Sequence, residues 1–354
     1  MIELRIGGRP VGPNHPCFII AEAGSNHDGK LEQALRLVDV ATSAGADAVK
    51  FQTFRARSMY PRTSGRVEYL AALGIETPIY ELTESMEMPD EWIPQLAAHA
   101  ARRGIAFLST AFDEATADLL EPYVPAFKVA SYELTHIPLI RHIARKGRPV
   151  LLSTGGATMA EVKEAVAVAQ VEGNDQIVVL QCTACYPAPL ESIDVRALAA
   201  LREEVGVLVG LSDHSRDPLP APLAAVALGA CVVEKHFTLD RSFPGPDHSF
   251  AIDPNELKDL VKAIRDVERA LGSAEKRVRD VERELVDYRR GIFTLRAVPA
   301  GTRFTRDDVA VLRRAGRPDI GRHPRDFPEI LTKRAARDLV AGHLVTNEDV
   351  AEQA

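Results

Sequence analysis

Residues 18–53 read FIIAEAGSNHDGKLEQALRLVDVATSAGADAVKFQT. The apolar run 18–24 suits a buried strand, and the apolar residues of 31–45 recur at helical spacing until Gly45. A second apolar run, 48–53, predicts another buried strand. Two buried strands joined by a helix make a βαβ unit, in which the strands are parallel. This stretch therefore predicts an α/β fold built on a parallel sheet.

Strand-like runs and helical patterns continue to alternate along the chain. Further strands are predicted at 106–112, 126–131, 149–155, 177–182, 207–213 and 231–237. Helices are predicted at 90–104 with Asp90 as cap, and at 136–147, 159–170, 194–205 and 255–272, whereas residues 54 to about 88 predict an irregular insertion. An open doubly wound sheet is the alternative, but no GxGxxG follows the first strand. The series therefore favours a closed (β/α)8 TIM barrel.

The composition changes after Gly272. Residues 273–290 are dense in charge and predict a solvated linker. From 291 to 354 the pattern is β-rich, and the phrases VPAGTRFTRDDV (298–309) and LVAGHLVTNEDV (339–350) form a small pseudo-repeat. We expect three parts: a barrel catalytic domain over 1–272, a linker over 273–290 and a small β-rich domain over 291–354.

Bulk properties exclude several classes of protein. The chain has 354 residues and a formal net charge of -7, which argues against wrapping nucleic acid. No apolar run is long enough to cross a membrane, and no signal-peptide pattern opens the chain. The scattered cysteines fit a reducing cytoplasm, and the single pair Cys182 and Cys185 predicts neither a zinc nor a redox site. We therefore expect a cytoplasmic globular protein.

Polar residues gather where the predicted strands end, which in such a barrel is the pole that holds the active site. Because neighbouring strands lie about 4.8 Å apart, His214 and His236 can converge on one ion. Two imidazoles suit Mn, Fe, Co or Zn, and Mg less naturally. The alternative is a pair of core histidines.

Lysines within apolar strands need anionic partners. Lys50 and Lys128, with the hydroxyls of Thr110 and Ser153, predict a pocket for phosphate or carboxylate. A competing interpretation makes Lys128 or Lys235 the Schiff-base lysine of an aldolase.

Several phrases resemble the N-acetylneuraminate (sialic acid) synthase family, whose members also make legionaminic and pseudaminic acids. They are AEAGSNHDG (21–29), DAVKFQ (47–52), STAFD (109–113), FKVAS (127–131), LSTG (152–155), QCTACYPAP (181–189), GLSDHS (210–215), EKHFTLD (234–240) and PGPDH (244–248). The tail is similar to the family's antifreeze-like (SAF) domain. The resemblance covers nearly the whole chain in order.

This resemblance implies a reaction of phosphoenolpyruvate (PEP) with an N-acyl amino sugar such as N-acetylmannosamine, giving a nine-carbon 2-keto acid and phosphate. It also implies a domain-swapped homodimer. The metal, usually Mn2+ with Mg2+ or Co2+ as alternatives, would be bound by His214 and His236. PEP would be held by Lys50, Thr110, Lys128, Ser153 and Ser212. The sugar would be faced by Glu22, Gln52, Tyr186 and Asp247, and by Arg314 of the partner chain.

Some roles and alternatives stay open. We count Glu22, Lys50, Lys128 and Glu234 as catalytic candidates; Glu234 either acts on water or supports the metal site. Ala184, Tyr132 and Ala315 depart from the family's usual residues, and VASYE (129–133) is nearer to the pseudaminic-type phrase. A legionaminic or pseudaminic acid synthase using a diacetamido-hexose, a 3-deoxy sugar-acid synthase, a Schiff-base aldolase and a non-catalytic homologue are the alternatives.

Overall fold

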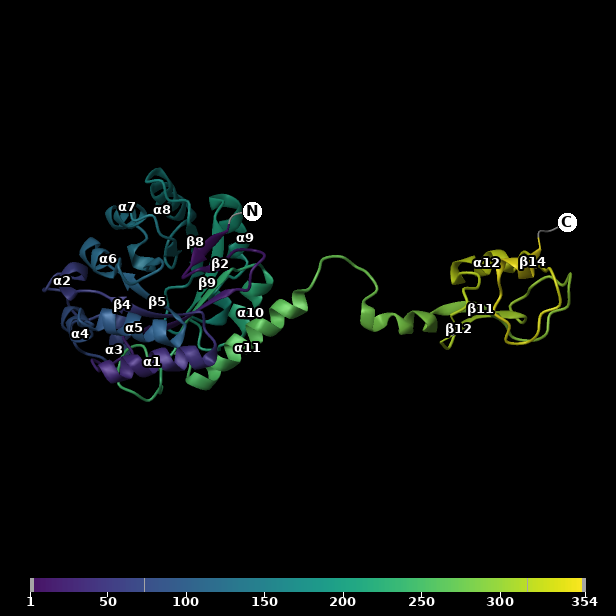
Figure 1. Ribbon diagram of the computed structural model, residues 1–354, viewed down its shortest axis with the longest axis horizontal. Coiled ribbons are helices and arrows are strands. Elements are labelled where there is room, and N and C mark those ends of the chain that lie inside the picture. Colours follow the sequence, from purple (N-terminus) through teal and green to yellow (C-terminus); the bar gives the residue numbers. More distant parts are fainter. Residues whose placement is uncertain (1–2, 73, 317, 352–354) are drawn as a thin grey trace. The chain divides into compact units, whose positions relative to one another are not determined.

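The computed structural model describes residues 3–72, 74–316 and 318–351. They form two compact units, Met1–Gly272 and Ser273–Ala354. Figure 1 labels many of the helices and strands of both units.

The first unit is a closed barrel of parallel strands in the order β10-β3-β4-β5-β6-β7-β8-β9. The strands are β3 (Phe18–Gly24), β4 (Ala48–Thr53), β5 (Ala106–Ala111), β6 (Phe127–Val129), β7 (Val150–Ser153), β8 (Ile177–Cys182), β9 (Leu208–Asp213) and β10 (Val232–His236). The last strand pairs with the first, since Val232 is in register with Phe18. The TIM barrel is confirmed, and the open sheet is excluded.

Helices connect the strands. They are α1 (Leu31–Ala44), α5 (Trp92–Arg103), α6 (Glu114–Leu120), α7 (Ile137–Ala144), α8 (Met159–Val171), α9 (Ala197–Val205), α10 (Pro220–Ala227) and α11 (Pro254–Leu271), with short turns η1 (Ser131–Glu133) and η2 (Leu190–Ser192). Capping boxes begin α6, α8 and α11, which satisfies backbone N–H groups that have no partner within the helix. Asp90 as the cap of α5 was wrong, because Glu91 takes that place and Asp90 pairs with Arg55.

The sequence pattern predicted an irregular insertion between β4 and α5, but the structure contains regular elements there. The insertion contains three short helices: α2 (Ala56–Met59), α3 (Glu68–Ala72) and α4 (Ile79–Ser85). Ile79, Tyr80 and Thr83 of α4 are buried, so this helix packs onto the unit. Helices of one or two turns have weak periodicity, which explains why the sequence pattern did not reveal them.

The inside of the barrel changes from apolar to polar along the strands. Side chains alternate along a strand, so Phe18 and Ile20 share the inner face of β3 with Glu22. Phe18 and Ile20 belong to an inner apolar cluster together with Leu4, Ile6 and Val11. The last three come from the hairpin of β1 (Leu4–Ile6) and β2 (Arg9–Val11), which packs at the amino-terminal side of the strands. Inside the barrel, the charged residues Glu22, Lys50 and Glu234 therefore lie toward the carboxyl-terminal ends of the strands.

The second unit is small and β-rich. Its elements are η3 (Asp280–Glu282), η4 (Glu284–Tyr288), β11 (Arg290–Thr294), β12 (Val309–Arg313), η5 (Pro324–Asp326), α12 (Phe327–Ile330), β13 (Arg334–Ala335), η6 (Asn347–Asp349) and β14 (Val350–Ala351). Its core includes Ile292, Phe304 and Val345.

The pseudo-repeat of this unit has a structural counterpart. Asp308 accepts from the backbone N–H of Thr305 at 2.8 Å, and Asp349 accepts from that of Thr346 at 2.8 Å. Arg296 pairs with Asp308 as Arg337 pairs with Asp349. Val298 of one phrase bridges Leu339 of the other. Equivalent turns are thus stabilised by equivalent ion pairs.

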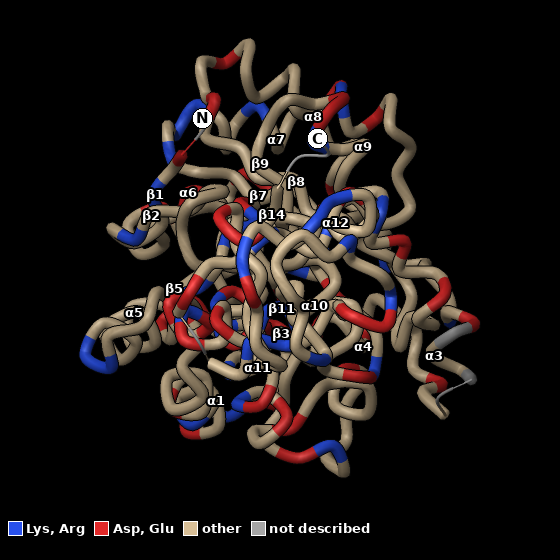
Figure 2. The backbone as a smooth tube through the Cα atoms, turned by 90° about the vertical axis from the view of Figure 1, so that its right-hand side faces the viewer, with Lys and Arg blue, Asp and Glu red and all other residues tan. Residues whose placement is uncertain are grey.

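Charged residues of both signs are interspersed along the backbone (Figure 2). Among the helices of the described residues, none combines the length and the apolarity needed to cross a bilayer.

Candidate active site

Lys50 lies at the centre of a buried charge cluster. Its Nζ is 2.6 Å from Oε2 of Glu22 and 3.5 Å from Oε1 of Glu234, and it donates to Oγ1 of Thr110 at 3.0 Å. Strand register explains this arrangement, because Lys50 on β4 is level with Glu22 on β3. Burial opposes the ammonium charge, but the two carboxylates raise the pKa of Lys50 above its ordinary value.

The two carboxyl groups beside Lys50 differ. Burial raises the pKa of Glu22 to about 7, although Lys50 acts in the opposite direction. Burial also opposes the charge of Glu234, but Lys50 and Lys128 bring its pKa below the ordinary value. Gln52 donates to Glu22 at 2.9 Å, and Ser212 donates to Glu234 at 3.2 Å. Environment therefore separates the two groups into one that holds a proton near neutrality and one that is ionised.

Lys128 and Ser153 lie on the next strands. Thr110 is in register with Lys128, whose Nζ donates to the backbone oxygen of Val129 at 2.8 Å. Burial lowers the pKa of this ammonium. The Ser153 hydroxyl is buried and has no hydrogen-bond partner among the described residues. Since a lysine and a hydroxyl with spare donors suit an anion, this side of the mouth can hold phosphate or carboxylate.

The two histidines face each other across adjacent strands, with ring centroids 5.3 Å apart. Nδ1 of His214 lies 2.8 Å from the carbonyl oxygen of Thr183 and donates to it, which leaves Nε2 as an acceptor. Nδ1 of His236 is buried and has no partner within the described part of the chain. Burial and the charge of His214 put the pKa of His236 well below its ordinary value, so its imidazole is neutral.

These histidines fit a divalent metal ion, because neutral imidazole is the form that binds metal. Burial opposes protonation of His214, but Cys182, 3.7 Å away, raises its pKa, so a metal would compete with a proton there. No cluster of three or more His, Cys, Asp or Glu residues with metal-binding geometry occurs in the described ranges. Water or substrate oxygens would have to complete the coordination.

A pocket of about 170 Å³ opens beside His236. It brings together Gln52, Tyr186 and Asp247 from three separate parts of the chain, together with the metal candidate His236. Tyr186 stacks on His214 with centroids 4.2 Å apart, and Phe250 lies 5.2 Å from His236. The insertion supplies an apolar wall through Met59, Leu70, Ile79, Leu82 and Met86.

Comparison with known proteins decides the family. The model described as NeuB family matches residues 37–276, and the model described as SAF domain matches residues 289–351. The chain belongs to the NeuB family. The fold and the SAF domain inferred from the sequence motifs are thereby confirmed.

Several relatives of this NeuB family chain are similar over nearly their whole length. The spore coat polysaccharide biosynthesis protein SpsE of Bacillus subtilis is 45% identical, with 99% of this chain and 98% of the relative covered. Its crystal structure covers all of both chains with a TM-score of 0.67. The N,N'-diacetyllegionaminic acid synthase of Legionella pneumophila is 41% identical over 95% of each chain.

A structure of N-acetylneuraminic acid synthetase from Leptospira borgpetersenii, in complex with citrate, has a TM-score of 0.72 at 31% identity. It covers 81% of this chain and 96% of that one. The chain is thus a member of a family of sialic-acid-type synthases.

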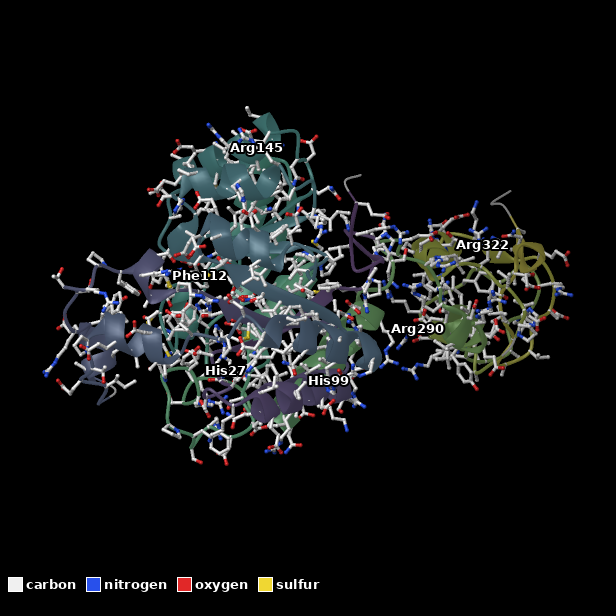
Figure 3. All side chains as sticks on the ribbon, turned by 60° about the vertical axis from the view of Figure 1, so that its left-hand side comes forward. His27, His99, Phe112, Arg145, Arg290 and Arg322 are labelled. Carbon is white, nitrogen blue, oxygen red and sulfur yellow. The ribbon has the colours of Figure 1, made fainter. Side chains whose placement is uncertain are left out.

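The family resemblance implies that Arg314 faces the sugar of the partner chain, but in the structure its guanidinium is engaged within its own unit. Its guanidinium is buried in the second unit and donates to the backbone oxygens of Asp319 at 2.8 Å and Val286 at 2.9 Å. Asp287 lies 3.7 Å away. Most of its donors are therefore occupied within its own unit. Figure 3 labels Arg290 and Arg322 in the same unit.

Lys235 is an unsuitable Schiff-base lysine. Its side chain lies on the face of the sheet opposite to that of Glu234. There its Nζ is 2.7 Å from Oδ2 of Asp213 and also donates to Ser215. The cysteines Cys17, Cys182, Cys185 and Cys231 are free, so Cys182 and Cys185 form no disulfide.

Sequence reasoning missed Glu133. Its Oε2 is buried without a partner among the described residues, and burial raises its pKa to about 7 while Lys128 acts against this. Beside it, Ser131 accepts from the backbone N–H of Gly155 at 3.0 Å. The phrase VASYE contained a usable signal, since a glutamate in the short loop that follows β6 lies at the pole of the active site.

Proposed function

We propose that this protein condenses PEP with the open-chain aldehyde of an N-acyl hexosamine, giving a nine-carbon 2-keto acid and phosphate. One observation carries the proposal: an anion-binding side with Lys50, Lys128 and an unpartnered Ser153 hydroxyl lies in the same mouth as the histidine pair. A substrate with phosphate and carboxylate groups would suit the anion-binding side, and a carbonyl compound would suit the side with the histidine pair.

In the proposed reaction, C3 of PEP attacks the aldehyde carbon, and the new C–C bond leaves positive charge at C2. Water adds to C2 and loses a proton, and the tetrahedral intermediate expels phosphate by breaking the C2–O bond. Lys50 and Lys128 stabilise the carboxylate and phosphate charges throughout. A divalent ion bound by His214 and His236 would supply Lewis-acid polarisation of the aldehyde.

Two carboxyl groups carry the proton transfers in this proposal. Glu22 is the proton donor to the aldehyde oxygen, because a group with a pKa near 7 gives up and regains a proton readily at neutral pH. Glu234 is ionised and accepts the proton of the attacking water. Gln52, Tyr186 and Asp247 line the sugar side of the pocket.

The acyl amino sugar is the part of the proposal that rests on relatives. N-acetylmannosamine is our first candidate, because the chain is similar to an N-acetylneuraminic acid synthetase over 81% of its length. A diacetamido-hexose leading to a legionaminic-type acid is the second candidate, since a relative of that name is 41% identical. The apolar wall from the insertion suits acyl groups of either sugar.

The test is phosphate release from PEP with Mn2+ and a panel of amino sugars in H2(18)O, followed by mass measurement of both products. C–O cleavage predicts phosphate free of 18O and a 2-keto acid that is three carbons longer than the sugar. Labelled phosphate would mean cleavage at phosphorus and would refute the scheme. Trapping with pyruvate and borohydride would instead show a Schiff-base aldolase.

We also propose that the protein is a homodimer with exchanged SAF domains, an expectation that comes from the family resemblance. Light scattering of the full chain tests the dimer, and a monomer that retains full activity would contradict it.

A further inference from the structure

Asp247 belongs to the long loop between β10 and α11, residues 237–253, which is described throughout and contains no helix or strand. Its side chain lines the proposed sugar pocket and is half-buried there, and desolvation raises the pKa of its carboxyl group. Ser25 contacts this carboxyl group through its hydroxyl, at a long distance of 3.5 Å, and through its backbone N–H. A shorter and more buried attachment of the loop lies at the next residue.

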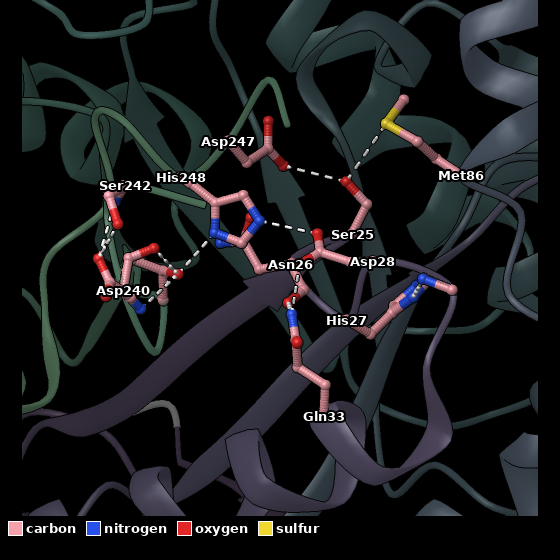
Figure 4. A network of polar contacts seen from close by, with 12 residues as sticks. Ser25, Asn26, His27, Asp28, Gln33, Met86, Asp240, Ser242, Asp247 and His248 are labelled. Carbon is pink, nitrogen blue, oxygen red and sulfur yellow. Dashed lines mark hydrogen bonds and ion pairs between the residues drawn. The ribbon is translucent and has the colours of Figure 1, made fainter. Parts of the chain in front are cut away.

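The adjacent residue, His248, provides a firm attachment. It is almost completely buried, and its Nε2 lies 2.8 Å from Oδ1 of Asp28 in the loop after β3. Its Nδ1 lies 2.6 Å from the hydroxyl of Thr238, just after β10. Because an ionised carboxylate only accepts, Nε2 carries the proton shared with Asp28. Figure 4 shows His248 pointing to Asp28 while Asp247 points toward Ser25.

Asp28 is itself held in place. Gln33 of α1 donates from Nε2 to Oδ2 of Asp28 at 2.5 Å and to the backbone oxygen of Asn26 at 2.7 Å. Asn26 in turn donates to the backbone oxygen of Phe237 at 2.9 Å. The loop after β3 and the loop after β10 are thus joined at several points, and Asp28 and His248 form the only ion pair between them among the described residues.

Two glycines leave room for this arrangement. A Cβ on Gly24 would lie 3.0 Å from Oδ2 of Asp247, and it would also approach Gln52. A Cβ on Gly245 would lie 2.9 Å from Cδ2 of His248, and the φ of +148° at Gly245 is one that other residues rarely adopt. Side chains at either position would displace Asp247 or His248, so the backbone here is built closely around both.

We propose that Asp28 and His248 are positioning residues that hold Asp247 against the sugar side of the pocket and so determine affinity for the amino sugar. Neither side chain lines the pocket beside His236, so both act through Asp247. The effect on the sugar rests on the proposed function, whereas the attachment of the loop does not.

The first test is steady-state kinetics of the full chain with His248→Phe, which keeps a ring but removes both hydrogen bonds. The KM for the amino sugar should rise about tenfold, as expected for loss of a hydrogen bond to a charged group. The KM for PEP should stay within about twofold of the wild-type value. His248→Gln retains a donor toward Asp28 and should recover part of the loss. Unchanged KM for the sugar, or equal changes for both substrates, would overturn the proposal.

His99 offers a matched control. Its Nε2 lies 2.9 Å from Oδ1 of Asp39, in a histidine–aspartate pair on α5 and α1 away from the pocket (Figure 3). His99→Phe should leave both KM values unchanged. Asp28→Ala and His248→Ala should also be non-additive when combined, because each alone already breaks the same pair. Additive effects would contradict a shared role.

A second measurement does not depend on activity. Arg241 is exposed in the same loop and offers a trypsin site. His248→Phe should be cut after Arg241 about tenfold faster than wild type or His99→Phe, because the loop opens more readily. Equal cleavage rates would refute the attachment itself. If wild type condensed no sugar, the proposed function would fail, while the cleavage rates would still decide whether this pair holds the loop.

Discussion

Lys50 Nζ and Glu22 Oε2 lie 2.6 Å apart inside the barrel, and both side chains are almost completely buried. Taking two charges out of water is unfavourable unless each has partners. Here Lys50 also has Glu234 and Thr110, and Glu22 also accepts from Gln52. Buried clusters of charged groups with shifted pKa values concentrate at functional sites, which supports a role of this cluster in chemistry.

Lys50→Met should remove the cation that Glu22 and Glu234 share. Phosphate release should fall at least about a thousandfold, because a preorganised charge beside the developing phosphate and carboxylate is lost. The free energy of unfolding should fall by about 3–5 kcal/mol, since Glu22 and Glu234 then lack their shared cation. Lys262→Met is the control, because Lys262 forms an exposed pair with Asp266 and should change stability by about 0.5 kcal/mol or less. Near wild-type activity of Lys50→Met would contradict the proposed anion site.

Metal removal should stop the reaction. Treatment with a chelator should abolish phosphate release, and Mn2+ should restore it. His236→Ala should weaken Mn2+ binding at least about a hundredfold. Electron paramagnetic resonance of Mn2+ measures this binding. His142→Ala, which changes a surface histidine paired with Asp118, should bind Mn2+ like wild type. Full activity of the chelated protein would rule out the metal, whatever the histidine variants do.

Glu133 should make stability depend on pH. Burial raises its pKa from 4.5 to about 7 in the folded state, so the folded protein holds this proton more tightly than the unfolded chain. The stabilising contribution of protonated Glu133 to the free energy of unfolding is therefore fully present below about pH 4.5 and is lost as the pH rises to about 7. Over this window, the free energy of unfolding of wild type should fall by up to about 3 kcal/mol relative to Glu133→Gln. A difference that stays constant with pH would show that Glu133 is not so perturbed.

Arg314→Ala should loosen the second unit. Its guanidinium donates to the backbone oxygens of Asp319 and Val286, and these partly buried hydrogen bonds would be lost. Amide exchange in η4 and β11 should become faster, with a loss of about 2–3 kcal/mol in opening free energy. Arg314→Lys should lose nearly as much, because a lysine lacks the planar fork that reaches several acceptors. Unchanged exchange with a raised KM for the sugar would instead support a direct role at the substrate.

Local patterns predicted much of the fold. Apolar runs and helical spacing predicted all eight barrel strands and the longer helices, because period and strand length are properties of neighbouring residues. The shorter barrel helices α6 and α10 were not predicted. The short helices of the insertion were missed for the same reason, since four or five residues carry little periodicity. Asp90 illustrates another limit: its sequence position suits a helix cap, but an ion pair with Arg55 engages it instead.

The sequence by itself determined the TIM barrel, the SAF domain and the set of polar residues at the strand ends, through alternation along strands and motifs at fixed spacing. Only the tertiary structure decided how these residues act on one another. Register placed Glu22 beside Lys50; burial then raised the pKa of Glu22, whereas Lys50 and Lys128 brought that of Glu234 below its ordinary value. It also decided that Arg314 is buried in its own unit and that His248 meets Asp28 across 220 positions. Contacts and desolvation of this kind depend on residues far apart in the chain, which no local pattern records.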